Sequence, residues 1–360
     1  MQQTKCSICK QLYPSEELTK FDGSLLCPSC LAAETVICAD CGKRIRNRDN
    51  CGTISYPLCS ECREREYDFC QNCGTLMHRN RSQFIGGEPY CSDCYDSHYH
   101  AVIHEYDYKP EPIFYGSGPR YFGIELEIDD AGESGEYAEQ ILSVANLPSE
   151  RIYCKHDGSL DDGFEIVSHP MSPEYHLHSM CWEKVLAKAD ELGYSSHDAK
   201  TCGLHIHVSR AAFGESREEQ EEAVGRAVYF VEQHWDKLLK FSRRTQHQLE
   251  RWASRYGCKP HPKEMLAHVK NGHWSRYTCV NLDNRDTIEF RIFRGTLKFN
   301  TFVATLQLVN RICDVAFSLS DEELCALSWE DFVGQITESE LLAYLRERGL
   351  LPESEVRKDV

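Results

Sequence analysis

Residues 121–128 read YFGIELEI, an apolar segment that contains two glutamates. Successive side chains of a β-strand point to opposite faces, so Glu125 and Glu127 would lie side by side on one face of a strand. Two carboxylates at close range are costly to bury unless a cation neutralises them or the pKa of one is raised. The segment therefore predicts a strand that carries a candidate cation site.

The same spacing of polar side chains recurs in two later segments. His205 and His207 alternate with apolar residues in LHIHVS, and Glu289 and Arg291 do so in TIEFRIF. Each pair would share one face of its strand. The three strands together indicate one shared site, although histidines taken singly are more often core residues than metal ligands.

A glycine-containing turn lies between these segments. In KHDGSLDDGFEIVSHP, residues 155–170, Asp157 and Glu165 flank the turn and could bring two more carboxylates to the same cavity. Sites dominated by carboxylates with one imidazole suit Mg²⁺ or Mn²⁺ better than zinc. Such ions commonly accompany ATP.

Structural alternatives are open for these charged residues. Glu125 and Glu127 could pair with Arg291 and Arg294 as a buried ladder of salt bridges. Four further arginines could clamp the phosphates of ATP or form a solvated face, and these are Arg243, Arg244, Arg251 and Arg255.

Short apolar runs alternate with amphipathic segments beyond residue 120, which predicts an α+β domain over residues 120–360. Helices are expected at 135–146, 174–192, 217–242 and 301–319. Strands are expected at 151–155, 163–168, 204–209, 276–282 and 286–293. Two short helices are expected after the candidate N-caps Ser328 and Thr337.

Residues 97–119 are rich in Tyr, His, Pro and Gly and lack apolar periodicity, which predicts an extended linker. His98, His100 and His104 cluster in and beside it and could bind a metal. Histidines of a linker without neighbouring thiols are more often solvated or stacked, so no metal site is assigned to them.

The region before the linker, residues 1–96, is dominated by cysteine. Six C-x-x-C pairs repeat as C-x2-C-x17-C-x2-C with a period of 32 residues. The cysteines of these pairs are Cys6, Cys9, Cys27, Cys30, Cys38, Cys41, Cys59, Cys62, Cys70, Cys73, Cys91 and Cys94. The spacing predicts three tandem modules of similar structure.

Each module has the ligands of a structural zinc site. A C-x-x-C turn presents two thiolates to one ion, and two such turns complete a closed tetrahedral site. About three zinc ions are therefore expected, bound within modules or, alternatively, by pairs from neighbouring modules. The modules resemble zinc ribbons and LIM-like modules. A closed site leaves no position for catalysis, so a scaffolding or recognition role, with a protein partner, is expected.

Composition and charge limit the classes of function. The formal net charge is -17 and no run of 18 apolar residues occurs, so neither sequence-independent nucleic-acid binding nor a membrane-spanning helix is expected. The first ten residues lack the apolar core of a secretory signal, which favours a cytoplasmic location. In that reducing compartment metal binding by cysteine is favoured over disulfide formation.

Six segments resemble, in this order, motifs of the phage-type amidoligase family, a branch of the glutamine-synthetase-like carboxylate–amine ligases. They are FGIELEI, KHDGSL, GFEIVSHP, CGLHIHVS, RYTCVNL and TIEFRIFRGTL. The resemblance covers residues 106–300 and implies a glutamine-synthetase-like antiparallel sheet with packed helices. It also implies that the protein uses ATP with Mg²⁺ or Mn²⁺.

By this resemblance, Glu125 and Glu127 match the paired glutamates of the family, and His205 matches its metal-binding histidine. Asp157 and Glu165 stand eight residues apart like the acidic pair of the family, with Asp157 in place of the usual glutamate.

The remaining matches concern ATP. His207 would lie near the nucleotide phosphates, Glu289 would complete a second metal site, and Arg291 would neutralise the transferred phosphoryl group with help from Arg294.

Together the matches imply an ATP-dependent ligase that joins a carboxylate to an amine, each from an amino acid, peptide or protein, through an acyl phosphate. A metal-dependent hydrolase that uses His205, His207 and the carboxylates is one alternative. A catalytically inactive adaptor built on the zinc modules is another.

Overall fold

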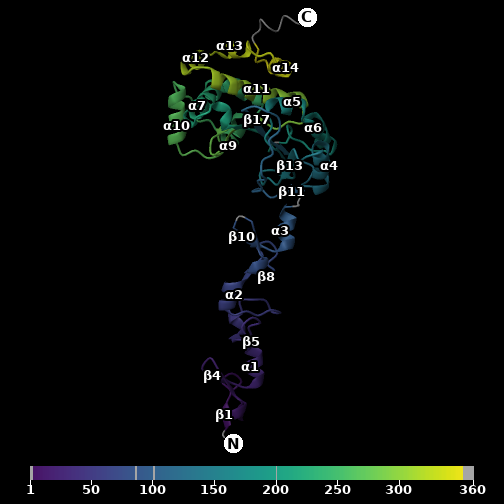
Figure 1. The fold of residues 1–360 in the computed structure, drawn as a ribbon, viewed down its shortest axis with the longest axis vertical. Coiled ribbons are helices and arrows are strands. Elements are labelled where there is room, and N and C mark those ends of the chain that lie inside the picture. Colours follow the sequence, from purple (N-terminus) through teal and green to yellow (C-terminus); the bar gives the residue numbers. More distant parts are fainter. Residues whose placement is uncertain (1–2, 86, 100–101, 200, 352–360) are drawn as a thin grey trace. The chain divides into compact units, whose positions relative to one another are not determined.

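The computed structural model describes residues 3–85, 87–99, 102–199 and 201–351. The chain divides into two compact units between residues 100 and 101 (Figure 1). In the described part of the chain, no helix is long and apolar enough to cross a bilayer.

The N-terminal unit repeats one small motif three times. Each repeat begins with a hairpin that carries the first cysteine pair, formed by β1 (Gln3–Lys5) and β2 (Leu12–Pro14), β5 (Thr35–Ile37) and β6 (Arg44–Arg46), or β7 (Tyr67–Phe69) and β8 (Leu76–His78). Each repeat ends in a helix that starts directly after the third cysteine, namely α1 (Pro28–Glu34), α2 (Ser60–Glu66) or α3 (Ser92–Tyr99).

The middle repeat differs from the other two in its second half. The outer repeats form a second hairpin there, from β3 (Thr19–Phe21) and β4 (Ser24–Leu26) or from β9 (Gln83–Ile85) and β10 (Glu88–Tyr90). In the first repeat, the turn of this hairpin places Gly23 at φ +74°. The middle repeat has Ser55 at the equivalent position, beside the β-branched Ile54, and neither residue adopts such a φ readily. Residues 51–57, all of which the structure describes, accordingly form a loop with Ile54 98% exposed.

The C-terminal unit is built on a seven-stranded sheet. Its order is β11 (Ile103–His104), β13 (Ile152–Lys155), β14 (Phe164–Ser168), β12 (Phe122–Ile128), β15 (Gly203–Ser209), β17 (Thr287–Arg294) and β16 (Val280–Asn281). Neighbouring strands are antiparallel, except that the edge strand β11 runs parallel to β13. The predicted α+β class is confirmed, and the antiparallel pattern holds for all but this edge.

Helices supply the rest of the unit. They are α4 (Gly135–Ala145), α5 (Pro173–His178), α6 (Trp182–Glu191), α7 (Arg217–Gln233), α8 (Trp235–Ser242), α9 (Gln246–Trp252), α10 (Pro262–Asn271), α11 (Phe299–Ser318), α12 (Asp321–Ala326), α13 (Trp329–Val333) and α14 (Ser339–Glu347).

The two faces of the sheet differ in chemistry because side chains alternate along each strand. Ile124 and Leu126 of β12, Ile206 of β15 and Phe290 of β17 are fully buried in one hydrophobic core. The same core includes residues of α4, α6, α7, α8 and α11, so these helices pack against the apolar side of the sheet. The alternate positions of the strands carry the acids and histidines predicted to form the site.

Several expected elements have other limits in the structure. The helix expected at 174–192 is two helices, α5 and α6, because the chain turns at Ser179–Cys181. The helix expected at 217–242 breaks at His234, whose φ and ψ of -103° and 25° are not helical. The strand expected at 276–282 is only the two-residue β16, and α14 follows Glu338 instead of a Thr337 cap.

The expected linker at 97–119 is partly structured. Ile103 and His104 form β11, and Tyr115 exchanges backbone hydrogen bonds with residues 170 and 172 of the sheet domain. His104 stacks on Tyr108 at 3.6 Å between ring centroids, and stacking was one of the two alternatives to metal binding expected for these histidines. His100 and the side chain of His98 lie outside the described residues.

A buried histidine ties the first sheet strand to a helix. His176 Nε2 lies 3.1 Å from the carbonyl oxygen of Phe122, and Trp182 Nε1 donates to His176 Nδ1 at 3.1 Å. This pairing leaves Nδ1 as the acceptor, so the ring is neutral. Burial lowers the pKa of His176 to about 4.

This histidine makes stability depend on pH. The unfolded chain binds a proton at His176 near pH 6.5 and the folded chain only near pH 4, so stability falls as the pH drops between these values. The expected loss is on the order of 3 kcal/mol. Urea unfolding of the full chain from pH 4 to 7 should show a smaller pH dependence for His176→Gln than for the wild type. Equal slopes in the two proteins would contradict the assignment.

Candidate metal centres and candidate active site

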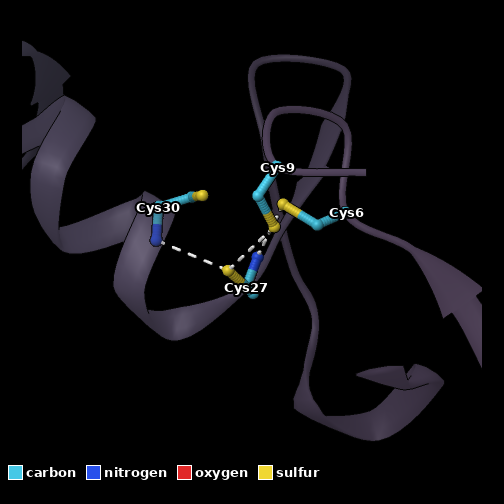
Figure 2. A group of neighbouring side chains, drawn as sticks. All are labelled: Cys6, Cys9, Cys27 and Cys30. Carbon is cyan, nitrogen blue, oxygen red and sulfur yellow. Dashed lines mark hydrogen bonds between the residues drawn. The ribbon is translucent and has the colours of Figure 1, made fainter. Parts of the chain in front are cut away.

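Each repeat of the N-terminal unit gathers four cysteines. In the first, Cys6 and Cys9 face Cys27 and Cys30 at the start of α1 (Figure 2). The other two clusters are Cys38, Cys41, Cys59 and Cys62, and Cys70, Cys73, Cys91 and Cys94. The cysteines therefore pair within repeats, which was one of the two predicted arrangements.

The spacing of the sulfurs fits zinc. The Sγ atoms of the second and third cysteines are 3.9, 3.8 and 3.8 Å apart in the three clusters, for Cys9 and Cys27, Cys41 and Cys59, and Cys73 and Cys91. A tetrahedral ion with zinc–sulfur bonds of about 2.3 Å separates its sulfurs by about 3.8 Å. The clusters can thus hold about three structural zinc ions in all.

The acidities of the thiols also call for a cation. Burial opposes ionisation of Cys6, but backbone amides, including that of Cys27, outweigh it and lower the pKa of Cys6 to about 6. The pKa of Cys30 is raised to about 12, first by its contact with the Cys27 thiol and then by burial. The Cys27 sulfur thus suppresses ionisation of the neighbouring Cys30 thiol. A bound ion with two positive charges would allow all four thiols of the cluster to ionise.

The second candidate site lies on the polar face of the sheet. Glu125 and Glu127 on β12, Glu165 on β14, His205 and His207 on β15, and Glu289 on β17 all point to this face. The residue pairs that stand opposite each other in the register are Glu125 and His205, Glu127 and Glu165, and His207 and Glu289. Four adjacent strands therefore place the predicted acids and imidazoles together.

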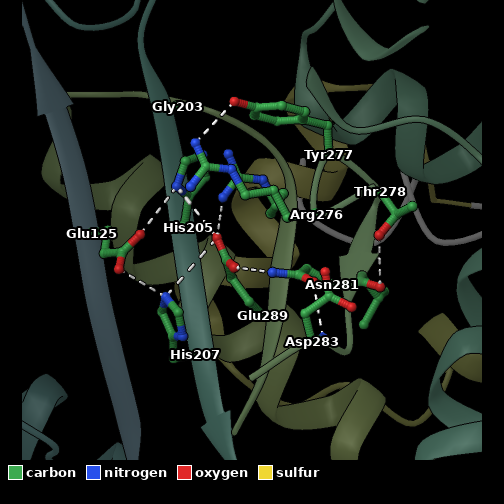
Figure 3. A network of polar contacts seen from close by, with 12 residues as sticks. Glu125, Gly203, His205, His207, Arg276, Tyr277, Thr278, Asn281, Asp283 and Glu289 are labelled. Carbon is green, nitrogen blue, oxygen red and sulfur yellow. Dashed lines mark hydrogen bonds and ion pairs between the residues drawn. The ribbon is translucent and has the colours of Figure 1, made fainter. Parts of the chain in front are cut away.

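Glu125 lies between the two histidines (Figure 3). Its Oε2 is 3.4 Å from His205 Nδ1, and its Oε1 is 3.0 Å from His207 Nε2. Glu289 Oε1 is 3.6 Å from His205 Nδ1 and 4.0 Å from His207 Nε2. His207 Nε2 is buried without an aligned hydrogen bond in the described residues, so these atoms converge on shared points instead of forming simple pairs.

Two sets of three potential ligand atoms result. Glu125, Glu165 and His205 form one set, and Glu125, His207 and Glu289 form the other, with all atoms of a set within 4.8 Å of one another. Glu125 belongs to both sets, as expected for neighbouring metal ions that share a carboxylate. Two carboxylates and one imidazole per set are donors that suit Mg²⁺ or Mn²⁺.

Burial and charge shift the pKa values of this cluster in opposite directions. Burial opposes ionisation of Glu125, but the charges and hydrogen bonds of His207 and His205 hold its pKa well below the usual range. Burial and the nearby Glu125 charge raise the pKa of Glu165 well above its usual value. Burial lowers the pKa of His207, but Glu125 outweighs this and raises it to about 9. These shifts show that the carboxylates of the cluster stabilise positive charge at this point of the sheet.

Glu127 and Glu289 are held by neighbours on the sheet. Glu127 Oε2 accepts a hydrogen bond from the backbone N–H of Gly203, and its Oε1 lies 3.7 Å from His205 Nε2. Glu289 accepts a hydrogen bond from Asn281 Nδ2 at 2.9 Å. Such contacts fix carboxylate orientation before any ion binds.

A buried aspartate shapes the loop between β13 and β14. The Asp129 carboxylate accepts hydrogen bonds from the amides of Asp161 and Asp162 at 3.0 and 2.6 Å and from Thr201 Oγ1 at 2.7 Å. Asp157 begins this loop and lines the cavity above the cluster. Its Oδ1 accepts the amide of Ser159 at 2.7 Å, and Asp157 is in neither set of three ligands.

Arginines border the acidic cluster at the far end of β17. Arg291 Nη1 forms an ion pair with Glu289, while its buried Nε has no hydrogen-bond partner in the described residues. Arg244 lines the same cavity, and its side chain meets the backbone of Gly203. Arg294 lies beyond this cavity, beside Arg243, whose carbonyl oxygen accepts a hydrogen bond from Arg294 Nη1 at 3.4 Å.

The structural alternatives for these residues have separate outcomes. No ion pair within 4.0 Å joins Glu125 or Glu127 to Arg291 or Arg294 in the part of the chain that the structure describes, so the predicted salt-bridge ladder is not formed. Arg255 pairs with Glu232 at 2.9 Å, which makes it structural.

Aromatic and basic side chains complete the wall of the cavity, and none of them was predicted as a site residue, although three lie in segments that carry the family resemblance. They are Tyr106, Lys155, Trp252, Arg276 and Tyr277. Arg276 donates to Tyr106 Oη and to Tyr277 Oη, and Lys155 Nζ lies 3.9 Å from Glu165 Oε2. Lys155 stands opposite Glu165 in the β13–β14 pair. Its place in the site could be predicted only if the register of these two strands were known.

Comparison with known proteins adds a family to this geometry. Residues 140–313 match a protein-family model described as "Putative amidoligase enzyme". The match confirms the resemblance to amidoligases over these residues and indicates a ligase-type enzyme. It includes Glu165, both histidines of β15 and Glu289, and begins after β12. No curated protein matches the chain.

The zinc clusters lead to a direct measurement. The full chain, purified under reducing conditions, should contain about three zinc ions by elemental analysis. Cys59→Ser should lower the content by about one ion and leave the C-terminal unit folded, because each cluster draws all its ligands from one repeat. The matched control is Cys258→Ser, which changes an exposed cysteine outside the clusters and should keep about three. Loss of more than one ion from Cys59→Ser would show that the repeats share ligands.

Proposed function

We propose that the protein is an ATP-dependent carboxylate–amine ligase that forms an amide or isopeptide bond through an acyl phosphate. The observation that carries the proposal is the convergence of three carboxylates and two imidazoles from β12, β14, β15 and β17 into two overlapping sets of ligand atoms. The match to the amidoligase model over residues 140–313 supports the same class of reaction.

The residues of the cluster have defined roles in this proposal. Glu125, Glu165 and His205 would hold one Mg²⁺ or Mn²⁺ ion, and Glu125, His207 and Glu289 would hold a second. Bound ions of this kind neutralise the charge that develops on transferred phosphoryl groups. Glu127 positions His205 from the neighbouring strand and completes the negative cluster.

The proposed reaction has two steps, phosphoryl transfer to the carboxylate and attack by the amine. A substrate carboxylate oxygen attacks the γ-phosphorus of ATP, and ADP leaves. The amine nitrogen then attacks the carbonyl carbon of the acyl phosphate, the carbon–oxygen bond to phosphate breaks, and the amine proton passes to the departing phosphate. Arg291 borders the cluster and provides a fixed positive charge for the transferred group, with Arg294 next in line along β17. Asp157 lines the cavity, and it and His207 would contact the nucleotide, as the family resemblance implies.

The zinc modules are proposed to recruit a substrate or a protein partner. Their four-thiolate sites are closed, which leaves no open position on the ion for chemistry. Their surfaces, including the exposed Ile54 loop of the middle repeat, are free for recognition.

Removing a carboxylate ligand from the cluster should strongly slow the reaction, whether the ligand belongs to both sets (Glu125) or to one (Glu289). Glu125→Ala and Glu289→Ala should each lower ADP release in the presence of a carboxylate substrate, an amine and Mg²⁺ by about a hundredfold or more. The zinc content should stay near three per chain because the clusters lie in the other unit. The control is Glu322→Ala, an exposed glutamate on α12, which should behave as the wild type.

Mass spectrometry of the protein with ATP, Mg²⁺ and a cell extract should also reveal a conjugate that has lost one water. Unchanged turnover in both alanine variants would end the two-metal proposal. Activity without ATP that disappears on zinc depletion would instead identify a hydrolase.

A further inference from the structure

A second cavity, the arginine hollow, lies beside the acidic cluster at the end of β17. Its volume is about 490 Å³, and α8, β17 and the residue after α14 contribute to its wall. Five permanently cationic side chains line it, against the single carboxylate of Asp236. The cationic residues are Lys240, Arg243, Arg244, Arg294 and Arg348.

In the described part of the chain, carboxylates do not neutralise these cations. Among the described residues, none of the five forms an ion pair within 4.0 Å, although acidic residues outnumber basic ones by 57 to 40 in the chain. Lys240 Nζ instead donates to the carbonyl oxygen of Gly349 at 2.9 Å, and Arg348 Nη2 donates to that of Lys240 at 2.8 Å. Carbonyl oxygens orient the cations and leave their net charge in place, so the hollow has a positive potential.

Arg244 links this hollow to the candidate active site. It lines both cavities and is only 8% exposed. In the described part of the chain, its guanidinium makes no hydrogen bond or ion pair, and burial lowers its pKa to about 10. An arginine that is buried without a partner is costly, and a bound anion would remove that cost. The same anion would then lie between the outer arginines and the acidic cluster.

The remaining lining residues distinguish between kinds of anion. Among the described residues, Leu239 is the one apolar side chain in the wall, and the imidazole of His197 is the one aromatic ring, with no Phe, Tyr or Trp beside it. A nucleoside would need an apolar or aromatic surface for its base, and such a surface lies on the other side of Arg244, where Tyr106, Trp252 and Tyr277 line the active-site cavity. Arginines form paired hydrogen bonds with carboxylates and phosphates alike, so it is the lack of a surface for its base that disfavours the nucleotide here. The arginine hollow therefore favours a ligand with several carboxylates over the nucleotide.

We propose that the arginine hollow binds an acidic peptide whose side-chain carboxylates pair with Lys240, Arg243 and Arg348 and whose reacting carboxylate reaches the acidic cluster past Arg244. Its role as the acyl substrate rests on the proposed ligase function, whereas the binding of the peptide does not. The ligase would then extend or modify polyanionic peptides.

Binding is tested with the full chain and without nucleotide. The probes are fluorescein-labelled penta-glutamate and penta-glutamine peptides, measured by fluorescence anisotropy at low and high salt. The wild type should bind penta-glutamate at least about tenfold more tightly than penta-glutamine, and the difference should shrink with salt. Lys240→Gln combined with Arg348→Gln keeps donors for the two carbonyl oxygens and removes two charges, so binding of penta-glutamate should fall about tenfold or more.

Two further proteins serve as controls. Lys240→Arg combined with Arg348→Lys keeps both charges and should retain binding. Arg285→Glu changes an exposed arginine outside the hollow and should bind penta-glutamate as the wild type does.

The outcomes separate this inference from the ligase proposal. Equal binding of penta-glutamate by the wild type and the double glutamine variant, or no binding at all, would overturn the inference. The inference would also be overturned if the double glutamine variant bound a fluorescent ATP analogue as much more weakly as it bound penta-glutamate, because the hollow would then bind the triphosphate. Charge-dependent binding of penta-glutamate in a protein that releases no ADP would support the anion site and contradict only the ligase.

Discussion

The candidate active site depends on the burial of like charges on one face of the central sheet. The apolar face of β12 must stay packed against the core, and strand alternation then forces Glu125 and Glu127 onto the opposite face, next to Glu165 and Glu289. Acids so close cannot all ionise without cations. In the structure the two histidines partly supply that charge, which explains why the pKa of Glu125 falls while that of Glu165 rises. Divalent ions would do the same more strongly.

The positive side of the site is arranged by the same sheet. The register between β15 and β17 shifts between Leu204 and Ile206, and Gly203 consequently stands opposite Arg294. Gly203 also has room for the Arg244 guanidinium only because it lacks a Cβ, which would lie 2.4 Å from that group. The acidic cluster and the arginine hollow are therefore neighbours along two strands. In the proposed reaction, this arrangement would place the substrate carboxylate beside the triphosphate that activates it.

The sequence predicted which residues lie together in the candidate site better than it predicted the elements around them. Alternation along a strand is a local property, so the pairs on β12, β15 and β17 were readable without the fold. The contribution of Tyr106 was not, because β11 and the loop after it have no periodic pattern and are held by pairing with β13. Likewise His234 and Ser179 break helices whose apolar stripes continue across the break, since Val231 and Trp235 are both buried. In these places tertiary packing, and not local preference, sets the structure.

The chain keeps two kinds of metal ligand apart, and this separation has a chemical reason. Thiolates bind zinc much more tightly than they bind Mg²⁺ or Mn²⁺, whereas carboxylates are ligands that suit Mg²⁺ and Mn²⁺. The four-thiolate clusters are confined to the N-terminal unit, and the carboxylate sets to the C-terminal unit. If the carboxylates were mixed with thiols in one cavity, zinc would displace the more weakly bound ion that phosphoryl transfer uses. Cys202 lies near Glu127 of the acidic cluster, and burial and that charge raise the pKa of its thiol, which disfavours the thiolate form that binds zinc.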